Sequence, residues 1–238
     1  MTHNNYFKFK QFEVLQHNSA MKVGTDGVLL GAWASAKKVY SVLDIGAGTG
    51  VISLMMAQRT NALISAIEID ESAYSDCKNN FQTSPWKDRL SVEHSSFQDF
   101  LKYNFRKFDC IVCNPPYFNQ KTKPGDYSRL LARHSGLLPF NVLIEGANSI
   151  LNKDGHLSII IPIETEREIR SFAADNRLFV SRLMRIKPKP SKPVSRILLE
   201  FKREAEIAEE KEISIETEVH HEYTPEFTLL VQDFYLYL

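Results

Sequence analysis

Short apolar runs alternate with longer amphipathic or buried segments through most of the chain. Each run is rich in Val, Ile or Leu and is bounded by polar or turn-forming residues, which predicts a buried strand. These five predicted strands cover residues 41–45, 63–69, 90–94, 108–113 and 156–161. The predicted helices among them cover residues 51–58, 71–81 and 140–151. Alternation of strand and helix predicts right-handed crossovers and therefore a parallel, doubly wound sheet.

The two ends of the chain depart from this alternation. Residues 180–186 and 196–202 are predicted strands joined by a loop rich in Pro and Lys, which indicates an antiparallel hairpin at the edge of the sheet. A helix is predicted before them, at 164–176. Near the N-terminus, residues 6–14 suggest a small hairpin, and Thr25 with Asp26 is expected to cap a helix that ends at Ala34.

The chain has 238 residues, 43% of them hydrophobic and 24% charged, which is enough to bury one substantial core. We therefore expect one α/β domain with a seven-stranded, mostly parallel sheet. Residues 1–38 would form an N-terminal hairpin and cap helix, 39–203 the catalytic core and 204–238 a C-terminal extension. No apolar run approaches the roughly 20 residues of a membrane span. Three cysteines and a polar N-terminus favour the cytoplasm.

The formal net charge of zero hides an asymmetry. Eight basic residues and one acid lie between Arg182 and Arg203, whereas nine Glu and one Lys lie between Glu204 and Glu226. A solvated polar face explains either run. A basic loop that binds phosphate, balanced by acid elsewhere, explains them equally well. Composition leaves both interpretations open.

A glycine-rich segment joins the first predicted strand to the first helix. Asp44 precedes Gly46, Gly48 and Gly50, and this Gly-x-Gly-x-Gly spacing differs from the Gly-x-Gly-x-x-Gly of dinucleotide-binding enzymes. Glu68 lies near the end of the second strand, where a carboxylate accepts hydrogen bonds from both hydroxyls of a ribose. The alternatives are that Glu68 is a surface acid or that Asp70 takes its place.

The sequence Asn114-Pro115-Pro116-Tyr117 directly follows the fourth strand, where a doubly wound sheet places its ligand chemistry. An amino group on adenine, or a glutamine amide, is a poor nucleophile because its lone pair is delocalised. The Asn114 side-chain oxygen and the Pro115 carbonyl could bind both N–H groups and restore that lone pair. Tyr117 could then stack on the planar target. The competing interpretation is a rigid turn after a strand.

Other residues suggest chemistry but favour structural roles. Cys110 and Cys113 point to opposite faces of one strand, so core packing explains them better than a metal or a disulfide. The histidines lack ligand-like spacing, and no metal is predicted. The aromatic segment 234–238 is expected to dock on the core rather than to form a base-stacking platform.

The glycine segment with its preceding acid resembles the first motif of class I methyltransferases, which have a Rossmann-like fold. Residues 9–12, 21–33, 223–227 and 233–236 extend the likeness to the bacterial family that methylates the N6 of adenosine 37, beside the anticodon of a valine tRNA. The resemblance implies S-adenosylmethionine as cofactor and tRNA as partner. Further site residues follow from it alone: Asp44 and the loop at the amino-acid part of the cofactor, Thr25, Asp26 and Gly27 over its methionine end, and Ser96, in place of the usual acid, with Phe97 at its adenine.

RNA contact is expected from basic residues in the predicted hairpin loop, after the Asn-Pro-Pro-Tyr motif and at the N-terminus. They are Lys187, Lys189 and Lys192 in the loop 187–196, Lys121, Lys123, Arg129 and Arg133 further upstream, and Lys8 and Lys10 at the N-terminus. No membrane and no oligomeric partner are indicated.

Three other functions are alternatives to tRNA methylation. Glutamine N5-methyltransferases of release factors share Asn-Pro-Pro-Tyr, but carry a helical N-terminal domain for which the roughly forty residues before the first strand are too few. A silent RNA-binding scaffold is disfavoured because Asn114 and Tyr117 are intact. A dehydrogenase is disfavoured by the glycine spacing.

Overall fold

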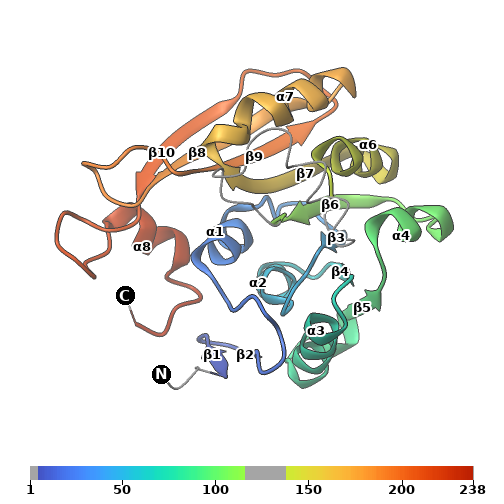
Figure 1. Ribbon diagram of the computed structural model, residues 1–238, viewed down its shortest axis with the longest axis horizontal. Coiled ribbons are helices and arrows are strands. Elements are labelled where there is room, and N and C mark those ends of the chain that lie inside the picture. Colours follow the sequence, from blue (N-terminus) through green and yellow to red (C-terminus); the bar gives the residue numbers. More distant parts are fainter. Residues whose placement is uncertain (1–4, 116–137, 238) are drawn as a thin grey trace.

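The computed structural model describes residues 5–115 and 138–237 of the chain. Within these residues, an eight-stranded sheet has the order β10-β8-β9-β7-β6-β3-β4-β5, and a separate hairpin joins β1 to β2 (Figure 1). The strands are β1 (Tyr6–Lys8), β2 (Glu13–Leu15), β3 (Ser41–Ile45), β4 (Leu63–Glu68), β5 (Leu90–His94), β6 (Phe108–Cys113), β7 (Leu151–Pro162), β8 (Phe179–Lys187), β9 (Arg196–Lys202) and β10 (Glu209–Ser214). The helices are α1 (Thr25–Trp33), α2 (Val51–Arg59), α3 (Glu71–Thr83), α4 (Phe97–Tyr103), α6 (Phe140–Ile150), α7 (Glu166–Asp175) and α8 (Pro225–Val231).

The predicted parallel sheet is confirmed in its central part. Strand β3 pairs in parallel with β4 and β6, which in turn pair in parallel with β5 and β7. In this register Ile45 lies opposite both Ile67 and Cys113. The carboxyl ends of β3, β4 and β6 therefore lie side by side at one edge of the sheet, and the loops that follow them can share a site.

The predicted hairpin is also confirmed, but it does not form the edge of the sheet. Strand β9 pairs antiparallel with both β7 and β8, so β8 ends at the same edge as the central strands. Outside β8 lies β10, paired in parallel with it. The sequence predicted seven strands and missed this eighth one, because β10 is glutamate-rich and mostly exposed.

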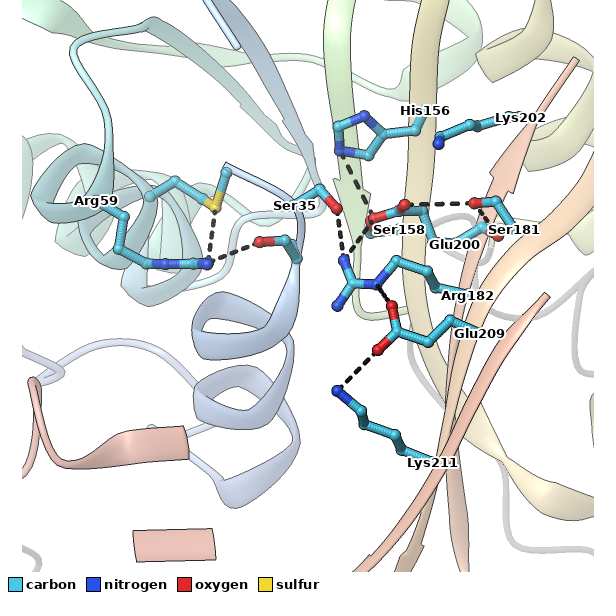
Figure 2. A network of polar contacts seen from close by, with 12 residues as sticks. Ser35, Arg59, His156, Ser158, Ser181, Arg182, Glu200, Lys202, Glu209 and Lys211 are labelled. Atoms are coloured by element: carbon cyan, nitrogen blue, oxygen red, sulfur yellow. Dashed lines mark hydrogen bonds and ion pairs between the residues drawn. The ribbon is translucent and has the colours of Figure 1, made fainter. Parts of the chain in front are cut away.

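Ion pairs connect the polar strand β10 to β8, and a buried carboxylate of β9 contacts the same arginine of β8. Arg182 of β8 lies 3.6 Å from Glu209 and 3.3 Å from Glu200, a β9 carboxylate that is 1% exposed. Figure 2 shows that Arg182 also meets Ser35, while Glu200 faces the hydroxyls of neighbouring strands. The charged pattern of β10 thus complements basic residues of β8, which hydrophobic periodicity does not register.

Helix α1 begins differently from its prediction. Its N-cap is Gly24, and no side chain caps it, so Thr25 and Asp26 lie inside the first turn. The Asp26 carboxylate instead accepts a hydrogen bond of 2.9 Å from Arg196 at the start of β9. This ion pair joins the entry of α1 to the hairpin.

Helices cover both faces of the sheet. One core contains α1, α2, α3 and α8, and the other contains α4, α6 and α7 (Figure 1). Cys110 belongs to the first core and Cys113 to the second, as the strand period predicted. The prediction that the aromatic tail docks on the core is confirmed at Phe234, which is 2% exposed. Among the described residues, no helix is long and apolar enough to cross a membrane.

Candidate cofactor and catalytic site

Two adjoining cavities open at the carboxyl ends of β3, β4 and β6. The first, of about 270 Å³, extends from the glycine loop to Glu68 and residues 95–98. The second, of about 360 Å³, extends from the glycine loop to residues 21–27 at the entry of α1. Asn114 and Pro115 line both cavities, as do Gly46 and Gly48. The residues after β6 therefore lie between the two cavities and border each of them.

The glycine loop has a backbone conformation that residues with a side chain rarely adopt. Gly48 has a φ of +57°, and nothing lies within 4 Å of the place where its Cβ would be, because that place borders the cavities. Gly50, the N-cap of α2, has a φ of +82°, and its Cβ would lie 2.6 Å from the ring of Phe81. Gly48 thus keeps the cavity open, whereas Gly50 lets α2 and α3 pack.

Glu68 ties the loops of β3 and β4 together. Its Oε2 accepts a hydrogen bond of 2.7 Å from the Gly48 amide, and its Oε1 accepts one of 2.9 Å from the Asp70 amide. The side chain is 7% exposed and lines the first cavity. Each carboxylate oxygen has lone pairs for a second donor, so Glu68 can still accept hydrogen bonds from a ligand in the cavity.

Asp44 lies beneath the loop rather than among the residues that line the cavities. It is 0% exposed, and its Oδ2 accepts hydrogen bonds of 3.1 and 2.7 Å from the amide and hydroxyl of Ser53 in α2. Burial raises the pKa of Asp44 to about 7, against the opposing effect of the Ser53 hydrogen bonds. Its Oδ1 has no hydrogen-bond partner among the described residues. Asp44 is therefore a buried acid next to the glycine loop, and its Oδ1 atom is an acceptor without a hydrogen bond within the described part of the chain.

The wall after β5 consists of residues 95–98. Ser96 is the N-cap of α4: its hydroxyl accepts from the Asp99 amide and donates to the Asp99 carboxylate, at 3.0 and 2.7 Å. Phe97 is 4% exposed and packs so closely on Gly146 of α6 that a Cβ there would meet its ring at 2.6 Å. Both residues line the first cavity, but Phe97 also belongs to the core.

Comparison with known proteins assigns this arrangement to a family. Residues 21–170 match the family model described as the methyltransferase small domain. Two curated relatives, from Christiangramia forsetii and Flavobacterium psychrophilum, are each 45% identical to the chain. The matches cover 99% and 97% of this chain and 99% of each relative, and both relatives are named tRNA1(Val) (adenine(37)-N6)-methyltransferase. The chain belongs to this methyltransferase family.

Solved structures support the fold of a methyltransferase. A predicted O-methyltransferase from Agrobacterium tumefaciens superposes with a TM-score of 0.67 at 19% identity, covering 88% of this chain and 96% of that one. A ribosomal protein L11 methylase from Lactobacillus delbrueckii superposes with a TM-score of 0.54 at 20% identity, covering 75% and 77%. At such identities the likeness concerns the fold alone.

Most of the residues singled out in the sequence meet at the methyltransferase cavities. Gly46, Gly48, Glu68, Asn114 and Pro115 converge there from three strands. So do Thr25, Asp26 and Gly27, from the entry of α1, and Ser96 with Phe97. Asp44 and Gly50 lie behind the loop and shape it. Tyr117, Lys121, Lys123, Arg129 and Arg133 lie outside the described residues.

The sequence did not indicate how the segment before α1 is held over the methyltransferase cavity. Asp76 of α3 accepts hydrogen bonds of 2.9 and 2.8 Å from the amides of Asn18 and Ser19, and two more from their side chains. Burial alone would raise the pKa of Asp76, but these hydrogen bonds lower it on balance. Ser19, Ala20 and Met21 line the first cavity as a result. More than fifty residues separate the partners, so no local pattern could reveal them.

The basic loop faces the acidic extension of this methyltransferase. Lys187 pairs with Glu212 at 2.6 Å, and Lys189 pairs with Glu216 at 3.5 Å. The side chain of Lys192 has no hydrogen bond or ion pair among the described residues. Two lysines of the loop are therefore paired with glutamates, and the charge of Lys192 contributes to lowering the pKa of Glu218. Phosphate binding by the loop stays a prediction.

The structure brings together one cluster of histidines and a glutamate that the spacing of the histidines in the sequence did not indicate. Within the described part of the chain, Glu216, His220 and His221 bring ligand-type atoms within 4.8 Å of one another. Glu216 also pairs with Lys189, and the two histidine side chains are 72% and 80% exposed. These features describe a surface ion-pair cluster at the turn after β10.

Proposed function

We propose that this protein transfers a methyl group from S-adenosylmethionine to the N6 of adenosine 37 in tRNA1(Val), as the names of its relatives state for them. The observation that carries the proposal is the position of Asn114 and Pro115. They follow β6 directly and line both the cavity that contains Glu68 and the cavity beside α1. A methyl donor and an acceptor base that occupied these two cavities would meet at this pair of residues. A tRNA substrate places the reaction in the cytoplasm.

The residues of the first cavity fit the proposed cofactor. Glu68 offers acceptors for the two ribose hydroxyls, and the open space at Gly46 and Gly48 lets a ligand approach the backbone. The apolar wall of Ile67 and Phe97 suits an adenine ring. When bound, the cofactor supplies a methyl group on a positively charged sulfur. Asp44, buried beside the loop with one oxygen unpartnered, adds negative charge in its ionised form.

Asn114 and Pro115 activate the acceptor nitrogen. The lone pair of an adenine N6 is delocalised into the ring, so the nitrogen must become pyramidal before it attacks. The Asn114 side-chain oxygen and the Pro115 carbonyl accept hydrogen bonds from the two N–H groups and stabilise that geometry. Tyr117 is assigned the stacking contact with the base. After transfer the methylated nitrogen is positively charged and gives its extra proton to water, so no side chain is required as a general base.

The tRNA backbone is proposed to lie along the carboxyl edge of the sheet. The loop 187–196 is at this edge because β8 runs parallel to the central strands. Lys192 is the loop lysine assigned to a phosphate, with Lys187 and Lys189 held by glutamates. Lys121, Lys123, Arg129 and Arg133 are assigned further phosphate contacts. Each phosphate neutralised makes the affinity for tRNA fall more steeply with salt.

Single-turnover methyl transfer to purified tRNA tests the proposal. Asn114→Ala should lower the rate by about 10²–10³-fold, the usual effect of removing one oriented polar group at a transition state. Its affinity for S-adenosylmethionine, measured by calorimetry, should stay near that of the wild type. Asn79→Ala is the matched control, because Asn79 is exposed on α3 and borders neither cavity. Near-normal turnover by Asn114→Ala would exclude the mechanism, and methylation of a release-factor glutamine in place of tRNA would exclude the substrate.

A further inference from the structure

A third cavity lies between the two ends of the chain. It has a volume of about 400 Å³ and is bordered by β1, the entry of α1 and the last residues of the C-terminal tail. Val23, Gly24 and Thr25 line it and also line the second cavity of the reaction site. The third cavity therefore shares part of its wall with the second cavity, which Asn114 also lines. We call it the terminal aromatic pocket.

Aromatic rings and one lysine supply most of the wall of the terminal aromatic pocket. Phe7 and Lys8 come from β1, and Tyr223, Tyr235 and Tyr237 come from the C-terminal extension. The ring centroids of Phe7 and Tyr235 are 5.9 Å apart, so the two segments meet through their side chains. Among the described residues that line the pocket, the only charged side chain is that of Lys8. Rings that border a cavity beside a cation are the combination by which proteins hold unstacked nucleotides.

The pocket is built before any ligand arrives. Phe9 forms a β-bridge with Tyr235, and the Lys10 amide donates a hydrogen bond of 2.8 Å to the Phe234 carbonyl. Phe234 is buried beneath it. Burial raises the pKa of Tyr235 to about 12. A preformed wall costs little ordering entropy when a base binds to it.

Two groups at the pocket remain available to a ligand. Tyr237 is 87% exposed, and Lys8 is exposed with no hydrogen bond or ion pair within the described residues. A single exposed aromatic is ordinary in itself. Lys8 lies opposite Glu13 in the register of the β1–β2 hairpin. Here the exposed ring and the exposed cation border the same cavity, and that cavity shares a wall with the second cavity.

We propose that the terminal aromatic pocket binds a second base of the anticodon loop, a neighbour of the methylated adenosine, by stacking on its rings while Lys8 contacts the adjoining phosphate. The inference rests on the proposed function. When the target base is turned out toward Asn114, its neighbours lose a stacking partner. The aromatic wall replaces that partner for any base, because every base has a π-face. The pocket therefore adds affinity for a single-stranded loop and does not select a sequence.

The test uses a synthetic anticodon stem-loop as methyl acceptor, with Tyr237→Ala as the main variant. KM for the stem-loop should rise at least fivefold, within the range that loss of one base–aromatic stack produces, while kcat and the affinity for S-adenosylmethionine stay unchanged. Tyr237→Phe should restore KM. Tyr103→Ala is the matched control, because Tyr103 is 79% exposed at the end of α4, and lines none of the three cavities. Lys8→Ala should reduce the salt dependence of stem-loop binding by about one phosphate contact.

An equilibrium measurement separates this inference from the proposed function. Stem-loops that carry 2-aminopurine next to position 37 should change fluorescence on binding to the wild type, and Tyr237→Ala should reduce the change. If the wild type methylates the stem-loop and Tyr237→Ala behaves like Tyr103→Ala in both assays, the pocket has no such role. If the wild type methylates no tRNA, the proposed function fails, and the fluorescence result still decides whether the pocket holds a base.

Discussion

Two substitutions in the glycine loop should differ in their effects: Gly50→Ala should mainly lower stability, and Gly48→Ala should mainly lower the affinity for the cofactor. Gly50→Ala places a methyl group 2.6 Å from the Phe81 ring and 2.8 Å from the Cys77 sulfur, both of which are buried. Overpacking of this kind costs about 1–3 kcal/mol, and a left-handed residue with a Cβ costs about 1–2 kcal/mol more. The free energy of unfolding should therefore fall by about 2–5 kcal/mol.

Gly48→Ala carries only the second of these costs. Its φ of +57° is unfavourable for alanine, but nothing lies within 4 Å of the new methyl group. The free energy of unfolding should fall by about 1–2 kcal/mol. The methyl group would instead occupy space at the border of both cavities, beside the Glu68 carboxylate that holds the Gly48 amide. The affinity for S-adenosylmethionine should therefore fall more in Gly48→Ala than in Gly50→Ala, when both variants are measured in their folded state.

Urea unfolding of both variants and calorimetry with S-adenosylmethionine measure the two effects. Both experiments are carried out at a temperature at which each variant is folded in the absence of urea. Equal unfolding midpoints for the two variants would refute the packing argument at Gly50. Wild-type affinity in Gly48→Ala would refute the assignment of the cavity to the cofactor.

Three further predictions concern charged groups. Glu68→Ala should lower the affinity for S-adenosylmethionine by about 1.5–3 kcal/mol in calorimetry, because two charge-assisted acceptors are lost; unchanged affinity would remove Glu68 from the site. Asp44 has a folded pKa raised from 3.8 to about 7, so its contribution to the stability of the cofactor-free fold is present below about pH 4 and is lost as the pH rises through about 7. The wild type should then lose up to about 4 kcal/mol relative to Asp44→Asn between pH 4 and 8, and parallel stability curves would contradict this. Lys192→Glu should weaken tRNA binding at low salt more than Lys187→Glu, whose lysine already faces a glutamate; equal effects in a binding titration would count against the assignment of Lys192.

The sequence by itself determined the parallel core and the positions of its ligand-binding loops. A short run of apolar residues is buried on both faces of a sheet only when it forms a central strand. Parallel pairing of such strands brings their carboxyl ends to one edge of the sheet. The glycine loop, Glu68 and residues 114–115 therefore had to converge, and Gly46, Gly48, Glu68, Asn114 and Pro115 all line the first cavity. The opposite orientations of Cys110 and Cys113 followed from the same period of two.

Tertiary structure alone decided how polar groups are paired. Strand β10 pairs by its backbone with β8 and buries Ile213, and Glu209, Glu210 and Glu212 meet basic residues of β8, none of which a glutamate-rich segment reveals. The same contacts determine which lysines of the basic loop remain available. Hydrophobic burial depends on local periodicity and can be anticipated from the chain, whereas an ion pair or a shared cavity depends on which distant segments become neighbours. The hydrogen bonds from Ser19 to Asp76, and the contact of Phe7 in β1 with Tyr235 of the C-terminal tail, could be known only once the fold had brought these segments together.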